Sequence, residues 1–189
     1  MDKLIDLIRR ETGESHRQLE ASLDLESHLT DRQTYRALLV RFYGIYAALE
    51  GQMEECERLH AFGYRFGERR KLLALARDLQ ALGMTEADIV QIAQPQIAPI
   101  AGPGDALGAA YVMEGSTLGG QVITRLIARH DESLPTAFFN VYGLETRPRW
   151  LEFLSCLEKY EKSGADPAPV AAAARTTFAL FQDWLVRPA

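Results

Sequence analysis

The sequence predicts an all-α protein, and two observations support this fold class. Apolar residues recur at the three- and four-residue spacing of amphipathic helices along most of the chain. No segment shows the strict apolar–polar alternation of a half-buried strand, and no internal repeat or low-complexity tract interrupts the helical pattern. At 189 residues the chain is long enough to bury one core. We therefore expect roughly seven or eight helices in a single domain that covers residues 1–189.

Composition and charge exclude several classes of function. The chain is 47% hydrophobic and 25% charged, which is typical of globular proteins. Its net charge of −5 and the absence of a basic run argue against a nucleic-acid partner. No apolar run reaches the roughly 18 residues of a membrane span, and the amphipathic, acid-bearing N-terminus does not resemble a signal peptide. Cys56 and Cys156 lie far apart and without metal-ligand spacing, so we expect reduced thiols in a cytoplasmic protein.

The N-terminal part of the chain contains two long predicted helices. The first, Asp2–Leu23, carries apolar residues close to one face and ends where a polar stretch begins. Thr30 and Asp31 are predicted to cap the second helix, Arg32–Glu57, because short polar side chains accept the first backbone N–H bonds of a helix. The second helix has an aromatic and aliphatic stripe that we interpret as core.

Shorter elements fill the middle of the chain. Leu59–Gly67 is a broken aromatic segment, and Glu68–Leu82 is a predicted helix that ends at Gly83. Thr85 is expected to cap a short helix, Thr85–Ile92. The following stretch holds three prolines and is predicted to be an extended linker.

The C-terminal half contains a glycine-bearing helix and two ordinary ones. Gly104–His130 has the helical pattern despite its glycines, and an aromatic loop follows at Ala137–Gly143. Arg147–Lys162 is a predicted helix with Pro148 in its first turn, a favoured position for proline. Pro167–Val186, with apolar residues at helical spacing, completes the chain.

The glycines of this central helix are its unusual feature. Each glycine inside a helix costs roughly 1 kcal/mol relative to alanine. Three of them, Gly115, Gly119 and Gly120, fall within six residues, with Ser116 and Thr117 between them. One explanation is a small-residue face against which another helix packs. The other is a flat ligand that lies against uncovered backbone where the helix bends.

His16 falls on the apolar face of the first predicted helix. The ordinary explanation is a buried imidazole that bonds to a neighbour. The functional one is a metal or haem ligand directed into the interior. Arg9 lies two turns earlier on nearly the same face, so it would place a positive charge over the same region.

Other catalytic patterns are absent or incomplete. The spacing of Glu57 and His60 is used in di-iron bundles, but such a centre needs this motif twice and it occurs once. Asp24 and His28 also form a single pair. Neither cysteine sits in a recognisable catalytic setting, and Ser116 has no base nearby in sequence. The glycine run follows a helix rather than a strand and has no Lys-Ser/Thr after it, which argues against a phosphate-binding loop. What remains is a histidine on one helix and uncovered backbone on another, and haem could be held between them.

Two segments resemble the haem oxygenases. RRETGESHRQLE is similar to the proximal helix of that family, and YVMEGSTLGGQVI is similar to its distal helix. The resemblance extends to the closing helix, TTFALFQDWL, and is closest to the soluble bacterial type associated with phytochromes. It implies a single-domain helical bundle with haem held between the proximal N-terminal helix and a glycine-rich, bent distal helix.

The resemblance also implies roles for individual residues. His16 would be the proximal iron ligand, and Gly115, Gly119 and Gly120 would let the distal helix approach the porphyrin and leave room for O₂. Cations for the haem propionates are expected at Arg9 and Arg149. The side chains expected to line or contact the haem pocket are Tyr111, Thr117, Phe139, Tyr142, Phe178 and Phe181. Many family members have Asp where this chain has Ser116, whose hydroxyl can hold water but carries no charge.

The implied activity is the cleavage of haem to biliverdin, CO and ferrous iron. Haem would be both cofactor and substrate, with O₂ and electrons from an external donor such as ferredoxin or flavodoxin with its reductase. A bacteriophytochrome is the expected product acceptor. Two alternatives remain at this stage: a haem carrier or sensor on the same fold, and a helical adaptor that binds no haem and whose glycines serve packing alone.

Overall fold

The computed structural model describes residues 3–54 and 56–186, and every regular element among them is helical. The all-α prediction is confirmed. The predicted helix start at Asp2, and Glu55 within the second predicted helix, lie outside the described residues. The α-helices are α1 (Leu4–Ser22), α2 (Arg32–Glu54), α3 (Leu72–Ala81), α4 (Glu86–Val90), α5 (Pro103–Gly115), α6 (Gly120–His130), α7 (Thr146–Lys162) and α8 (Ala168–Leu185). Short 3₁₀ helices are η1 (Glu26–Leu29), η2 (Glu57–Phe62), η3 (Phe66–Arg69), η4 (Ser116–Gly119) and η5 (Gly143–Glu145).

Side-chain caps explain where two of the helices begin. The Asp31 carboxylate accepts the backbone N–H groups of Gln33 and Thr34 at 2.7 and 2.9 Å, so it caps α2 as expected. Thr30, the other expected cap, instead donates its hydroxyl to the Ser27 carbonyl at the end of η1. Thr85 caps α4 through a reciprocal capping box with Asp88.

The predicted helix over Glu68–Leu82 is wrong in its first turn. The chain forms η3 up to Arg69, and α3 begins at Leu72. The buried carboxylate of Glu50 on α2 accepts the backbone N–H groups of Lys71 and Leu72 at 2.6 and 3.3 Å. These are N-terminal donors that a continuous helix would have bonded within itself, so the long-range contact sets the start of α3.

The predicted helix over Gly104–His130 is three elements. α5 ends at Gly115, a 3₁₀ turn covers Ser116–Gly119, and α6 continues from Gly120. The hydroxyls of Ser116 and Thr117 donate to the carbonyls of Met113 and Glu114, each three residues back, at 2.9 and 2.7 Å. These bonds tighten the backbone at the break between α5 and α6.

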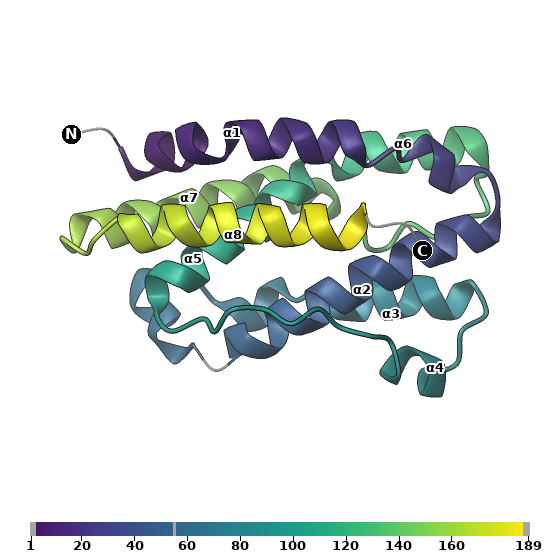
Figure 1. The fold of residues 1–189 in the computed structure, drawn as a ribbon, viewed down its shortest axis with the longest axis horizontal. Helices are drawn as coiled ribbons and strands as arrows, with labels where there is room; N and C mark the ends of the chain where they lie inside the picture. Colours follow the sequence, from purple (N-terminus) through teal and green to yellow (C-terminus); the bar gives the residue numbers. More distant parts are fainter. Residues whose placement is uncertain (1–2, 55, 187–189) are drawn as a thin grey trace.

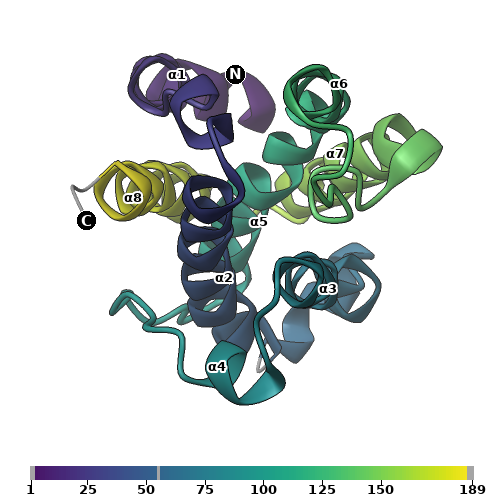
Figure 2. The same ribbon diagram turned by 90° about the vertical axis from the view of Figure 1, so that its right-hand side faces the viewer.

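The helices pack around α5. Figure 2 shows α5 at the centre of the molecule, with α2, α7 and α8 around it. α1 lies on α8, and α6 lies on the same side of the molecule as α1 (Figures 1 and 2). Gly108 lets α5 and α8 touch, because a Cβ there would come within 2.3 Å of the Val170 carbonyl oxygen. Among the described residues, no helix combines the length and the apolar character that crossing a bilayer requires.

Candidate functional site

A cavity of about 560 Å³ lies between α1 and the broken α5–α6 segment. Its volume falls within the range usual for small-molecule and cofactor sites, roughly 300–1,000 Å³. Side chains from α2, α7, α8 and the loop after α6 close the remaining walls. Most of the wall is apolar and aromatic, and its charged groups come mainly from α1. A flat apolar ligand with a charged edge fits such a cavity.

α1 supplies the polar wall. His16 lines the cavity with a half-exposed side chain, and its ring meets Phe178 of α8 edge-on at a centroid distance of 5.6 Å. His16 Nε2 lies 3.6 Å from Glu20 Oε1, which is beyond hydrogen-bond range. Arg9 and Arg17 line the same wall. The described side chains contain no group of three or more metal-binding residues, so a metal held here by the protein would rest on His16 and on ligands from outside the chain.

The broken helix supplies the opposite wall, and its glycines differ from one another. A Cβ built on Gly119 would meet only Ile123, at 4.0 Å, and one on Gly115 would meet only Trp150, at 3.8 Å. Both glycines line the cavity, as does Gly120. A Cβ on Gly120 would lie 2.0 Å from the Phe139 carbonyl oxygen. Gly120 therefore serves packing, whereas Gly115 and Gly119 keep the backbone open toward the cavity.

The hydroxyls of this wall are already bonded within the protein. The Ser116 Oγ donates to Met113 and lies 3.0 Å from the Tyr46 hydroxyl, so Tyr46 is the donor of that second bond. Burial raises the pKa of Tyr46 well above its usual value. Thr117 lines the cavity too, with its hydroxyl on the Glu114 carbonyl. Ser116 therefore offers remaining acceptor capacity, and no acidic proton, to a ligand.

Four of the expected aromatic side chains line the cavity: Tyr111, Phe139, Phe178 and Phe181. Burial raises the pKa of Tyr111, and its hydrogen bonds to Thr12 and Arg9 oppose the shift. Tyr111 thereby connects α5 to the polar wall on α1.

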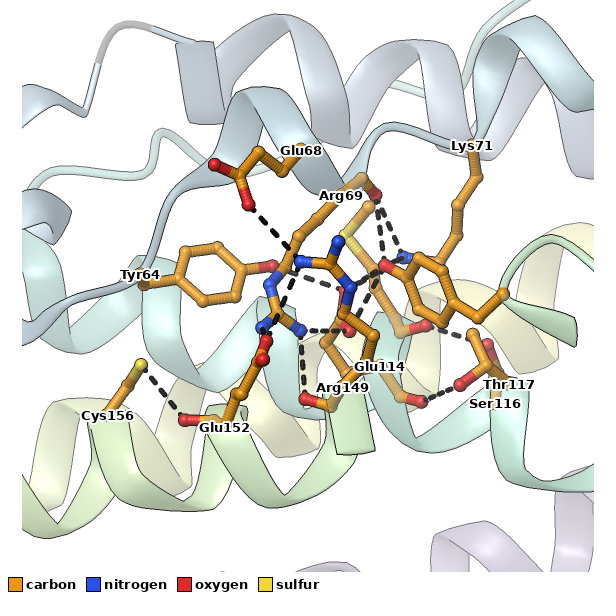
Figure 3. Close-up of polar contacts among 12 residues, drawn as sticks. Tyr64, Glu68, Arg69, Lys71, Glu114, Ser116, Thr117, Arg149, Glu152 and Cys156 are labelled. Carbon is orange, nitrogen blue, oxygen red and sulfur yellow. Dashed lines mark hydrogen bonds and ion pairs between the residues drawn. The ribbon is translucent and has the colours of Figure 1, made fainter. Parts of the chain in front are cut away.

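Tyr142 and Arg149 do not line the cavity, which corrects two of the expected contacts. The Tyr142 hydroxyl lies instead against the buried Glu114 carboxylate, 3.1 Å from Oε1. Arg149 of α7 forms ion pairs with Glu68 of η3 and Glu152 of α7 at 3.2 and 3.6 Å (Figure 3). Tyr142 and Arg149 lie at suitable places in the sequence, but their side chains contact polar groups behind the wall of the cavity instead.

Several side chains that contribute to the cavity could not be identified from the sequence. Phe42 and Tyr46 of α2 line the cavity although their spacing was that of an ordinary core stripe, and Lys71, which also lines it, belongs to no motif of the sequence. Asp78 of α3 does not line the cavity but fixes one wall, because its carboxylate accepts the backbone N–H groups of Ala137 and Phe138 at 2.9 and 2.8 Å. In the sequence, the only indication of this role was that Asp78, a charged residue, falls on the apolar face of its helix.

The sequence profile of the haem oxygenase family matches residues 2–187. The chain belongs to the haem oxygenase family. It is 32% identical over 161 residues to a haem oxygenase from Xanthomonas campestris pv. campestris, a match that covers 84% of this chain and 93% of that protein. Its fold matches the structure of haem oxygenase from Leptospira interrogans with a TM-score of 0.76 at 20% identity, over 98% of this chain and 99% of the other. Family membership makes the chain an oxidoreductase of haem degradation, and haem is its implied substrate and cofactor.

Proposed function

We propose that this chain holds haem in the cavity between α1 and the α5–α6 break, where His16 would bind the iron. The activity is O₂- and reductant-dependent cleavage of haem to biliverdin, CO and ferrous iron. The observation that carries this assignment is the pairing of one cavity-lining histidine with uncovered backbone at Gly115 and Gly119 on the opposite wall. It occurs in a chain of the haem oxygenase family.

Haem, when bound, supplies the oxygen chemistry, and the protein supplies geometry and charge. The neutral imidazole of His16 would offer a nitrogen lone pair to the iron, since Glu20 lies too far away to hold that nitrogen in a hydrogen bond. Gly115 and Gly119 would admit the ring face because they carry no side chain of their own and nothing lies closer than 3.8 Å to where their Cβ atoms would be. Arg9 and Arg17 stand at the charged edge of the cavity and suit the propionate carboxylates.

Ser116 and Tyr46 would hold water on the distal side. The Ser116 oxygen keeps one lone pair for a water molecule after it accepts the bond from Tyr46. Gly115, Ser116, Gly119 and Gly120 therefore form the distal wall of the proposed active site, with Gly120 acting through its contact with Phe139. Tyr111, Thr117, Phe139, Phe178 and Phe181 would enclose the ring.

We further propose a cytoplasmic enzyme formed by one domain over residues 1–189, supplied with electrons by ferredoxin or flavodoxin and its reductase. One buried core runs from Leu4 in α1 to Leu185 in α8, which supports a single domain. Neither a nucleic acid nor a membrane is proposed as a partner, and a bacteriophytochrome is the proposed acceptor of biliverdin.

The test is an optical titration of the purified chain with haem, followed by reductant in air. The proposal predicts a Soret band that saturates at one haem per chain and then bleaches to the broad red absorption of biliverdin. Saturation without bleaching would instead establish a haem carrier or sensor. The absence of any Soret change would show that the chain binds no haem, and it would contradict the proposal.

A further inference from the structure

A cluster of buried charges lies directly behind the distal wall. Lys71 and Glu114 are each 1% exposed, and Arg69 is 4% exposed. The buried hydroxyls of Tyr64 and Tyr142 complete this group, which we call the buried ion cluster. Burying ions costs several kcal/mol for each ion unless partners surround them. A protein retains such a cluster more readily where the buried charge contributes to function.

Glu114 is the centre of the cluster (Figure 3). Its Oε1 lies 2.8 Å from Lys71 Nζ, and its Oε2 lies 2.8 Å from Arg69 Nη1. The Tyr142 hydroxyl lies 3.1 Å from the same carboxylate, and Arg69 also reaches Glu152 on α7 at 2.9 Å. Glu114 immediately precedes Gly115, so these contacts fix the last turn of α5 where the cavity wall begins.

Lys71 is the member of the cluster that lines the cavity. Its ammonium group donates to the Arg69 carbonyl at 3.1 Å, to Glu114 at 2.8 Å and to the Tyr142 hydroxyl at 3.2 Å. An ammonium group has three N–H donors, and these three acceptors use all of them. Lys71 therefore has no donor left for a ligand, and it can influence the cavity only through its electric field.

The distal wall has no other ion among the described residues that line the cavity. The remaining charged groups there, Arg9, Arg17, Glu20 and His16 when protonated, all lie on α1. Ser116 of this wall is neutral. Lys71 is thus the ion that gives this wall a fixed positive charge.

We propose that Lys71 supplies the fixed positive charge of the distal wall, that Glu114 and Tyr142 position it, and that this charge lowers the proton affinity of water held beside haem. The proposal rests on the proposed function. A positive charge disfavours protonation of a nearby group, and its effect is larger in a cavity of low dielectric than in water. The groups that face Lys71 from its neighbours are the Glu114 carboxylate, the Arg69 carbonyl, the Tyr142 hydroxyl and the charge of Glu50.

The test follows the acid–alkaline spectral transition of the ferric haem complex as a function of pH. Lys71→Met removes the cation nearer the cavity and should raise the midpoint by about 0.5 pH unit or more. Glu114→Gln leaves the Lys71 charge unbalanced and should lower the midpoint. Glu152→Gln is the matched control, because it removes the same charge from the exposed end of the cluster, and its midpoint should stay at the wild-type value.

Opposite shifts in the two variants support an electrostatic role, since loosening of the wall would move both midpoints in the same direction. Equal shifts, or no shift, overturn the proposal. Where a single variant fails to fold, the double variant Lys71→Met/Glu114→Gln removes both charges together and avoids an unpaired ammonium or carboxylate. Its midpoint should still rise, by less than that of Lys71→Met, and an unchanged midpoint overturns the proposal. Failure of the wild-type chain to bind haem contradicts the proposed function itself, which separates the two failures.

Discussion

The glycines in and around the α5–α6 break serve two different purposes: some allow close packing, and others leave the backbone open toward the cavity. On the packed side, Gly108 and Gly120 touch carbonyl oxygens of Val170 and Phe139, where a Cβ would lie 2.3 and 2.0 Å away. On the cavity side, Gly115 and Gly119 meet nothing closer than 3.8 Å. The packed side should therefore determine stability and the cavity side should determine ligand binding. Substitutions that separate these two quantities test the comparison.

The largest effect is expected on the packed side. Gly120→Ala should lower the free energy of unfolding by about 3 kcal/mol, because the new methyl group overlaps the Phe139 carbonyl and backbone must move. Chemical denaturation measures this. Gly51→Ala on α2 is the matched control: its Cβ meets nothing within 4 Å, so the helix should gain roughly 0.5–1 kcal/mol. Equal stability of Gly120→Ala and wild type would contradict the packing role.

On the cavity side, Gly119→Leu should weaken haem binding at least about tenfold, since a side chain would cover the backbone that the ring approaches. The midpoint of thermal unfolding should change little, because the leucine would extend into the cavity. Gly51→Leu controls for the substitution itself and should leave haem affinity at the wild-type value. Unchanged affinity in Gly119→Leu would show that the ring does not lie against this wall.

A smaller loss of stability is expected where α3 holds the aromatic loop. Asp78→Asn replaces one acceptor oxygen with an amide donor that faces the backbone N–H of Ala137 or Phe138. The lost bond should cost about 1–2 kcal/mol of unfolding free energy. Denaturant titration measures the loss, and haem should still bind at one per chain. A variant as stable as wild type would show that the loop holds its place without this carboxylate.

The smallest effect is pH-dependent and concerns Glu50. Burial raises the pKa of this carboxyl above its ordinary value of 4.5, and its Oε2 has no partner. Ionisation is therefore less favourable in the folded than in the unfolded chain, so the destabilising contribution is absent below pH 4.5 and grows as the pH rises above it. Glu50→Gln should raise stability at pH 7 by less than about 1 kcal/mol and leave it unchanged near pH 4. Thermal unfolding at the two pH values measures the difference, and equal gains at both would contradict the linkage.

Local rules were sufficient for most of the fold. Apolar spacing located the long helices, and the caps at Asp31 and Thr85 act where short polar side chains were expected to act. The start of α3 could not be predicted, because it depends on Glu50, 21 residues earlier in the chain, which takes the N–H of Lys71. The break at Ser116–Gly119 was expected as a bend, but its 3₁₀ geometry depends on hydroxyl bonds within the turn.

The site could be predicted only in part for a related reason. Resemblance to a known motif located His16 and the glycines. Spacing alone did not distinguish Gly119, where a Cβ would meet nothing closer than 4.0 Å, from Gly120, where a Cβ would overlap the Phe139 carbonyl. Tyr142 was expected to line the haem pocket, and Lys71 belonged to no predicted site. Long-range contacts with Glu114, an ion pair for Lys71 and a hydrogen bond for Tyr142, decide where both side chains lie, and a single sequence contains no record of those contacts.

The most direct test of the central claim is the absorption spectrum of the haem complex of His16→Ala. His16 is the only histidine that lines the cavity among the described residues, and the exposed His130 provides a matched control as His130→Ala. Axial ligation by His16 predicts that His16→Ala loses the wild-type Soret position and regains it when imidazole is added, whereas His130→Ala keeps the wild-type spectrum. A wild-type spectrum in His16→Ala without imidazole would contradict the proposed site.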